Sequence, residues 1–95
     1  MMITVVNVRD TSAFDYYVGR PNILGNPFAI GTHGDREQVI HLWKGYAVRR
    51  AKIDENFRSA LLRCEHKIIA CHCKPDACHG DTFDESITYL KGQAM

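Results

Sequence analysis

The sequence predicts an α/β fold with a small, mostly parallel, Rossmann-like sheet flanked by about three helices. Two buried-strand patterns lie far apart in the chain, at about residues 2–8 and 67–73. The segment between them contains two helical patterns, and so long a helical connection favours parallel pairing through a right-handed crossover. With 95 residues and no internal repeat, the chain is expected to form one domain, residues 1–95.

The first strand is predicted over residues 2–8, where Ile3, Val5, Val6 and Val8 form a β-branched run. Residues 9–34 show no helical period and are punctuated by glycine and proline, apart from a short β-like patch at Tyr16 to Val18. Loops longer than about 12–15 residues in compact domains are usually functional or disordered. This loop is too apolar for disorder, so we predict a functional loop at about 9–34.

Caps and apolar spacing predict the helices. Asp35 and Gln38 have the spacing of a capping box, which predicts a helix over 35–51 with Trp43 on its apolar face. Asp54 resembles a second N-cap and begins a helix that runs to about Cys64. The last helix is predicted over 81–90, behind an acidic start that suits a helix N-terminus.

Composition disfavours two classes of partner. Lysine and arginine number 12 against 11 aspartate and glutamate, so no large net field exists to hold nucleic acid or an anionic membrane. The apolar runs fall far short of the ~20 residues that span a bilayer, and the first residues lack the pattern of a secretion signal. We therefore expect a cytoplasmic protein with reduced thiols. Its thin core predicts a homo-oligomer.

Residues 68–81 read IIACHCKPDACHGD and place three of the four cysteines where the second buried strand ends. Ligands bind at the carboxyl ends of strands in open α/β sheets. A zinc site would use Cys71, Cys73, Cys78 and His79, but one residue separates the first two cysteines where common zinc knuckles have two. On a strand, those two side chains would also point away from His72. We therefore expect no cofactor, with zinc as the disfavoured alternative; Cys71 also suits a small core position.

The end of this passage has the features of an anion site. Backbone N–H groups at a helix start bind anions, Gly80 permits a close approach, and Lys74 and His79 add positive charge or hydrogen bonds. The spacing matches neither the P-loop nor the dinucleotide fingerprint. An alternative is that Asp81 only caps the helix. The turn is predicted to hold a phosphate-sized anion.

The loop at residues 19–28 has two interpretations. Glycine and proline there are typical of a rigid connector. Alternatively, Arg20 offers a planar donor fork for a phosphate, Asn26 can donate to and accept from a base or ribose, and Phe28 can stack on a ring.

Together, the two segments resemble an uncharacterised domain-of-unknown-function family of short phage and bacterial proteins. The resemblance covers roughly Tyr17 to Leu90 and implies a fold and a site more than an activity. This chain has His72 where the family commonly has an aromatic residue and Thr82 where an aliphatic one is common, which makes the surroundings of the site more polar. The residues that match the family's motifs are Gly19, Arg20, Gly25, Asn26, Pro27, Phe28, Cys73, Pro75, Cys78, His79, Gly80 and Asp81.

We therefore expect a binding module for a phosphorylated nucleotide-like small molecule, in a pocket formed by the 19–28 loop and the 73–81 strand-to-helix turn. If the protein is phage-encoded, it would act in the host cytoplasm, where it could sequester a nucleotide signal of host immunity. The predicted ligand-binding residues are Arg20, Asn26, Phe28, Lys74, Cys78, His79, Gly80 and Asp81.

Two other functions stay open. A nucleotide- or nucleic-acid-processing enzyme would use Cys73 or Cys78 as nucleophile, His79 as general acid or base, and Asp81 to orient it. Since adjacent residues rarely bring both side chains into contact, its base could instead be His33, His41 or His72. The last alternative is a zinc-stabilised module that contacts a protein through Trp43, although the spacing of Trp43 favours the core.

Overall fold

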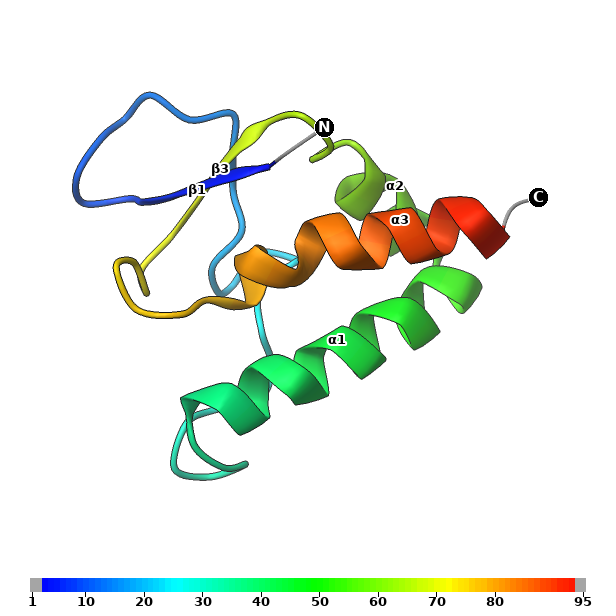
Figure 1. The fold of residues 1–95 in the computed structure, drawn as a ribbon, viewed down its shortest axis with the longest axis horizontal. Helices are drawn as coiled ribbons and strands as arrows, with labels where there is room; N and C mark the ends of the chain where they lie inside the picture. Colours follow the sequence, from blue (N-terminus) through cyan, green and yellow to red (C-terminus); the bar gives the residue numbers. More distant parts are fainter. Residues whose placement is uncertain (1–2, 94–95) are drawn as a thin grey trace.

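The computed structural model describes residues 3–93 and confirms the α/β fold. A small sheet lies to one side of three helices, which pack together (Figure 1). In chain order the elements are β1 (Thr4–Asn7), β2 (Tyr16–Tyr17), α1 (Arg36–Ile53), α2 (Glu55–Leu62), β3 (Ile68–Cys71), the 3-10 helix η1 (His79–Thr82) and α3 (Phe83–Gln93).

The sheet is parallel throughout and has the order β1-β3-β2. Thr4 lies opposite Ile68 and Asn7 opposite Cys71, as predicted for strands joined by a long helical crossover. The short β-like patch pairs as β2, with Tyr16 opposite Ile69. Strand β3 is therefore central, and its carboxyl end lies between segments from both sides of the sheet.

The predicted caps position α1 and α2. The Asp35 carboxylate accepts from the backbone N–H of Gln38 at 2.8 Å, and the Gln38 side chain accepts from the backbone N–H of Asp35 at 2.8 Å. Asp54 accepts from the backbone N–H of Phe57 at 3.1 Å and begins α2 in the same way. Helix α1 ends two residues later than predicted, at Ile53, because its last turn reaches to Asp54, whose extended backbone ends it.

The core lies between the helices and the sheet, and Trp43 is at its centre. The indole is fully buried and stacks on Phe83, with ring centroids 4.8 Å apart and an interplanar angle of 11°. Phe57 and Ile69 are also fully buried. Trp43 therefore belongs to the core, as its spacing favoured, and its side chain has no exposed surface in this structure.

Two boundaries near the predicted site differ from expectation. Strand β3 ends at Cys71, so the predicted strand residues up to Cys73 belong to a turn instead. The final helix begins at Phe83 and is preceded by η1, whose N-cap is Cys78. Asp81 is thus the third residue of η1 and does not cap a longer helix. Within residues 3–93, no helix is long and apolar enough to cross a membrane.

Candidate functional site

His79 joins the predicted loop to the turn after β3. Its Nε2 lies 3.0 Å from the carbonyl oxygen of Val18 and 2.9 Å from that of Leu24. Carbonyls only accept hydrogen bonds, so the ring proton is on Nε2 and both carbonyls accept from it. Burial lowers the pKa of His79, which favours the neutral imidazole. The His79 ring therefore fixes the backbone at Val18 and Leu24 against η1.

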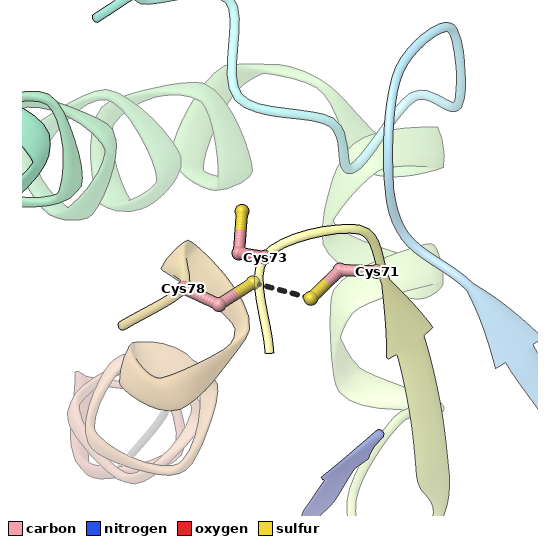
Figure 2. A group of neighbouring side chains, drawn as sticks. All are labelled: Cys71, Cys73 and Cys78. Carbon is pink, nitrogen blue, oxygen red and sulfur yellow. Dashed lines mark hydrogen bonds between the residues drawn. The ribbon is translucent and has the colours of Figure 1, made fainter. Parts of the chain in front are cut away.

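Three thiols gather where β3 ends. The sulfur atoms of Cys71, Cys73 and Cys78 all lie within 4.8 Å of one another (Figure 2). Cys78 Sγ donates to Cys71 Sγ across 2.8 Å. This bond, with backbone N–H groups of the turn, lowers the pKa of Cys71 to about 6, and the same bond together with burial raises the pKa of Cys78. The shared hydrogen bond favours the thiolate form at Cys71 and the thiol form at Cys78. The three-cysteine group could hold a metal ion.

The turn explains how a spacing that looks unsuitable for a metal brings these sulfurs together. Side-chain alternation stops with β3 at Cys71, and a backbone bond from Asp76 N–H to the Cys73 carbonyl at 2.8 Å folds the chain back. His72 is exposed and meets the edge of the Tyr17 ring. The objection based on strand geometry therefore does not apply, because Cys73 lies beyond the strand.

The backbone donors expected to bind an anion are engaged within η1. Cys78 N–H donates to Asp81 Oδ2 at 3.0 Å, Gly80 N–H donates to Cys78 Sγ at 3.4 Å, and Asp81 N–H donates to the Cys78 carbonyl at 2.9 Å. Lys74 Nζ lies 2.7 Å from Asp81 Oδ1, and this partner raises the pKa of Lys74. The Asp81 carboxylate thus occupies the position that the sequence suggested for a ligand anion.

A small pocket of about 70 Å³ lies between the loop and the turn. Five of the predicted ligand residues line it: Arg20, Asn26, Phe28, Cys78 and His79. Cys73 and Arg36, the first residue of α1, also belong to its wall. The other three predicted ligand residues, Lys74, Gly80 and Asp81, are not part of this wall.

Arg36 is the functional candidate that the sequence reasoning missed. Its guanidinium donates to the Ala77 carbonyl at 3.2 Å and lies 3.6 Å from a carboxylate oxygen of Asp76. Arg36 lies within the helix predicted over 35–51, but it was not among the predicted ligand-binding residues. Its position directly after the N-cap Asp35, where the functional loop ends, is the signal that could have identified it.

Asn26 and Phe28 have structural partners in the loop. Asn26 Nδ2 donates to the Val39 carbonyl at 3.0 Å, and its Oδ1 accepts from the Phe28 N–H at 2.9 Å. The Phe28 ring is half-buried and meets Tyr46 edge to face. Asn26 therefore ties the loop to α1, while Arg20 is exposed at the pocket.

Cys78 and His79 are poorly arranged for nucleophilic catalysis. Cys78 Sγ and His79 Nδ1 approach to 3.6 Å, closer than expected for adjacent residues, but Cys78 is buried and its raised pKa keeps it protonated. Asp81 does not hydrogen-bond the ring nitrogen that donates to Val18 and Leu24. His33, His41 and His72 are exposed and are not part of the pocket wall.

Three larger hollows lie elsewhere on the surface. One of about 690 Å³ is at the α1–α2 junction, with Arg49 and Arg50 in its wall. Another of about 710 Å³ is lined by the first half of α1, including Glu37 and His41. The third, of about 360 Å³, is lined by residues of α1 and α3. None of the three contains a residue of the paired motifs. We therefore place the candidate site at the smaller pocket, which gathers residues from both motifs.

These features define a small α/β protein with a thiol-lined pocket at the carboxyl end of its central strand. The chain belongs to the family described as Domain of unknown function (DUF4326), whose profile matches residues 6–89. An uncharacterized 12.4 kDa protein in the nrdA-td intergenic region of Enterobacteria phage T4 is 36% identical over 79 residues, which span 83% of this chain and 72% of that relative. No solved structure matches the chain. The comparisons confirm the family resemblance.

Proposed function

We propose that the protein binds a small phosphorylated, nucleotide-like molecule at the pocket between the loop and the turn. The observation that carries this proposal is the presence of two arginines, Arg20 and Arg36, in the wall of one pocket that also contains Phe28. Arginine presents a planar fork that matches phosphate oxygens, and hydrogen bonds to charged groups are the stronger ones. In this proposal the arginines bind the phosphate, which the sequence analysis had assigned to the backbone N–H groups at the start of the helix.

The size of the pocket limits what enters it. Its volume of about 70 Å³ is far below the ~300–1,000 Å³ of ordinary small-molecule sites. A phosphoryl-sized group would enter, and the rest of the ligand would lie across the mouth. Phe28 and the exposed side chain of Ile30 line the same pocket and offer apolar surface to a base or ribose.

Isothermal titration calorimetry tests this proposal with inorganic phosphate, AMP, cyclic nucleotides and ADP-ribose. We expect at least one nucleotide to bind below about millimolar and Arg20→Ala or Arg36→Ala to weaken it about 10-fold or more, since a charged hydrogen bond contributes roughly 1.5–3 kcal/mol. Arg49→Ala is the matched control on α1. The absence of measurable binding by all these probes would overturn the proposal.

The proposed ligand class and the phage relative together suggest a biological role. We propose that it acts in the host cytoplasm and sequesters a nucleotide signal of host immunity. The phage T4 relative supports the setting, and the arginine-containing pocket supports the ligand class. The test measures the free concentration of such a signal in infected cells that express either the wild-type protein or the Arg20→Ala variant. The wild-type protein should lower this concentration, and the variant should not. Equal effects of both proteins would contradict the role.

The thiol cluster favours a second candidate function, in which the protein holds a metal ion, and zinc is the ion we propose. Thiolates favour zinc, and tetrahedral Zn–S bonds of about 2.3 Å place sulfurs about 3.8 Å apart. The Cys71 and Cys78 sulfurs, now 2.8 Å apart, would separate by about 1 Å to receive it.

Metal analysis of the purified protein tests the zinc proposal. About one zinc per chain is expected for the wild-type protein and for Cys64→Ser, because Cys64 is a buried cysteine outside the group. Cys73→Ser should lose the metal. Equal zinc content in all three proteins would show that the cluster does not bind it.

A further inference from the structure

We infer that a metal ion on Cys71, Cys73 and Cys78 keeps one coordination position open toward the Arg20–Arg36 pocket, where an anionic oxygen of the ligand binds it. This inference rests on the proposed ligand site. It gives the metal and the arginines a common ligand and makes phosphate binding metal-dependent. Four observations carry it.

The number of available ligands is the first observation. Within residues 3–93, the metal-ligating groups that meet within 4.8 Å of one another here are the three thiols. Zinc in proteins takes four ligands, and sites with three protein ligands keep the fourth position for water or substrate. Three sulfurs therefore describe an open site rather than a closed structural one.

The second observation concerns His79, the fourth ligand suggested by the sequence. Its Nδ1 lies 3.6 Å from Cys78 Sγ but is outside the group of mutually close ligand atoms. The ring is held in place because its Nε2 bonds to two backbone carbonyls. With Nε2 fixed in this way, Nδ1 lies outside the group that the three sulfurs form. His79 thus stays a neighbour of the metal.

The third observation is the direction of the open position. Cys73 and Cys78 belong to the wall of the pocket, whereas Cys71 does not. Cys71 and Cys78 are both 1% exposed, and Cys73 is half-buried. Figure 2 shows the sulfurs of Cys71, at the end of β3, and Cys78, just before η1, pointing toward each other, while the sulfur of Cys73, on the turn, lies nearby and points away from that pair. An ion among these sulfurs has Cys71 behind it, so the position left open faces the pocket.

Charge is the fourth observation. Three thiolates outweigh a divalent cation by one negative charge, which alone would repel an anion. Arg20 and Arg36 line the same pocket and add two positive charges, of which that of Arg36 is shared with Asp76 at 3.6 Å. The arginines therefore offset the excess negative charge of the metal site. The ion supplies a bond to one oxygen, and the arginines supply hydrogen bonds to the others.

Cobalt(II) substitution tests the inference in the full-length protein. Tetrahedral cobalt bound by thiolates has d–d absorption bands that respond to exchange of a single ligand. We expect these bands to form in the wild-type protein and in Cys64→Ser but not in Cys73→Ser. Adding inorganic phosphate or AMP should shift these bands. The ligand concentration at the midpoint of the shift should equal the one that calorimetry gives for the cobalt protein. Arg36→Ala should raise this concentration about 10-fold or more.

The outcomes separate this inference from the two proposals before it. Calorimetric binding with unchanged d–d bands would overturn the open position and leave the ligand pocket standing. Binding by a protein that takes up no cobalt would likewise overturn the inference alone. No calorimetric binding would overturn the proposed function and this inference together. A large shift of the His79 Nδ1 resonance on zinc loading would identify His79 as the fourth ligand and contradict the open position.

Discussion

His79 was expected to contact a ligand, and the structure uses its ring to hold the chain together. The imidazole donates to carbonyls of Val18 and Leu24, more than fifty residues earlier in the sequence. A sequence pattern shows that a histidine follows a cysteine but not which carbonyls fold over it. The neighbouring residue Gly80 was likewise expected to admit an anion, and instead it packs against β3.

The state of His79 can be measured by nuclear magnetic resonance of its ring nitrogens. We expect the proton on Nε2 at neutral pH and a pKa below the ordinary value of about 6.5, because burial disfavours the cation. Since the unfolded chain then binds the proton more readily, this group's contribution to stability is present above about pH 6.5 and is lost as the pH falls. A proton on Nδ1, or titration at or above 6.5, would contradict the assignment.

Gly80→Ala tests the packing role of the glycine. A Cβ there would lie 3.0 Å from Ile69 Cδ1 and 3.5 Å from a methyl carbon of Val5, so we expect the free energy of unfolding to fall by about 1–3 kcal/mol. Gly92→Ala is the control, because a Cβ there meets nothing within 4 Å and alanine favours the helix. Urea denaturation measures both. Equal effects would show that Gly80 is not closely packed.

At the scale of elements, the sequence located features that depend on nearby residues, whereas the end of the central strand depends on residues far away in the chain. The capping box at Asp35 and the cap at Asp54 depend on residues three apart, so the sequence alone located both helix starts. The position at which β3 ends depends on a neighbouring strand. Asn7, in β1, donates from Nδ2 to the Lys74 carbonyl at 2.6 Å and so holds the turn that follows β3. The three-sulfur group follows from that turn, which is why spacing alone argued against a metal.

Asp35→Ala should weaken α1 without altering the sheet. Removing the carboxylate leaves the backbone N–H of Gln38 without its hydrogen-bond acceptor. The loss of such an N-cap lowers the free energy of unfolding by about 1 kcal/mol. Asp10→Ala, an exposed loop aspartate, is the control. Thermal unfolding followed by circular dichroism compares them. If the two variants melted alike, the capping box would contribute nothing measurable to stability.

At the scale of the whole molecule, one aromatic stack joins the helices beneath the site. Trp43 of α1 stacks on Phe83 of α3 and also meets the His79 ring at a centroid distance of 5.2 Å. Core and pocket therefore share a wall. The apolar spacing of α1 predicted that Trp43 would be buried, but not which ring would face it. The expectation of a homo-oligomer stays a prediction.

Trp43→Ala should destabilise the whole domain. Truncating a fully buried tryptophan costs about 3–5 kcal/mol, a large part of the 5–15 kcal/mol that usually holds a domain folded. Trp43→Phe should lower the free energy of unfolding much less, because it keeps an aromatic ring against Phe83. Guanidinium denaturation followed by circular dichroism gives both values. A loss below about 1 kcal/mol for the alanine variant would contradict this placement.

The central claim is that the small pocket, and not the larger hollow at the α1–α2 junction, binds the ligand. Chemical-shift mapping of the labelled protein during titration with AMP tests it most directly. The account predicts saturable shifts at Arg20, Phe28, Arg36 and Cys73, with Arg20→Ala weakening them. Shifts centred on Tyr46, Arg49 and Arg50 in the larger hollow, or no saturable shift anywhere, would contradict it.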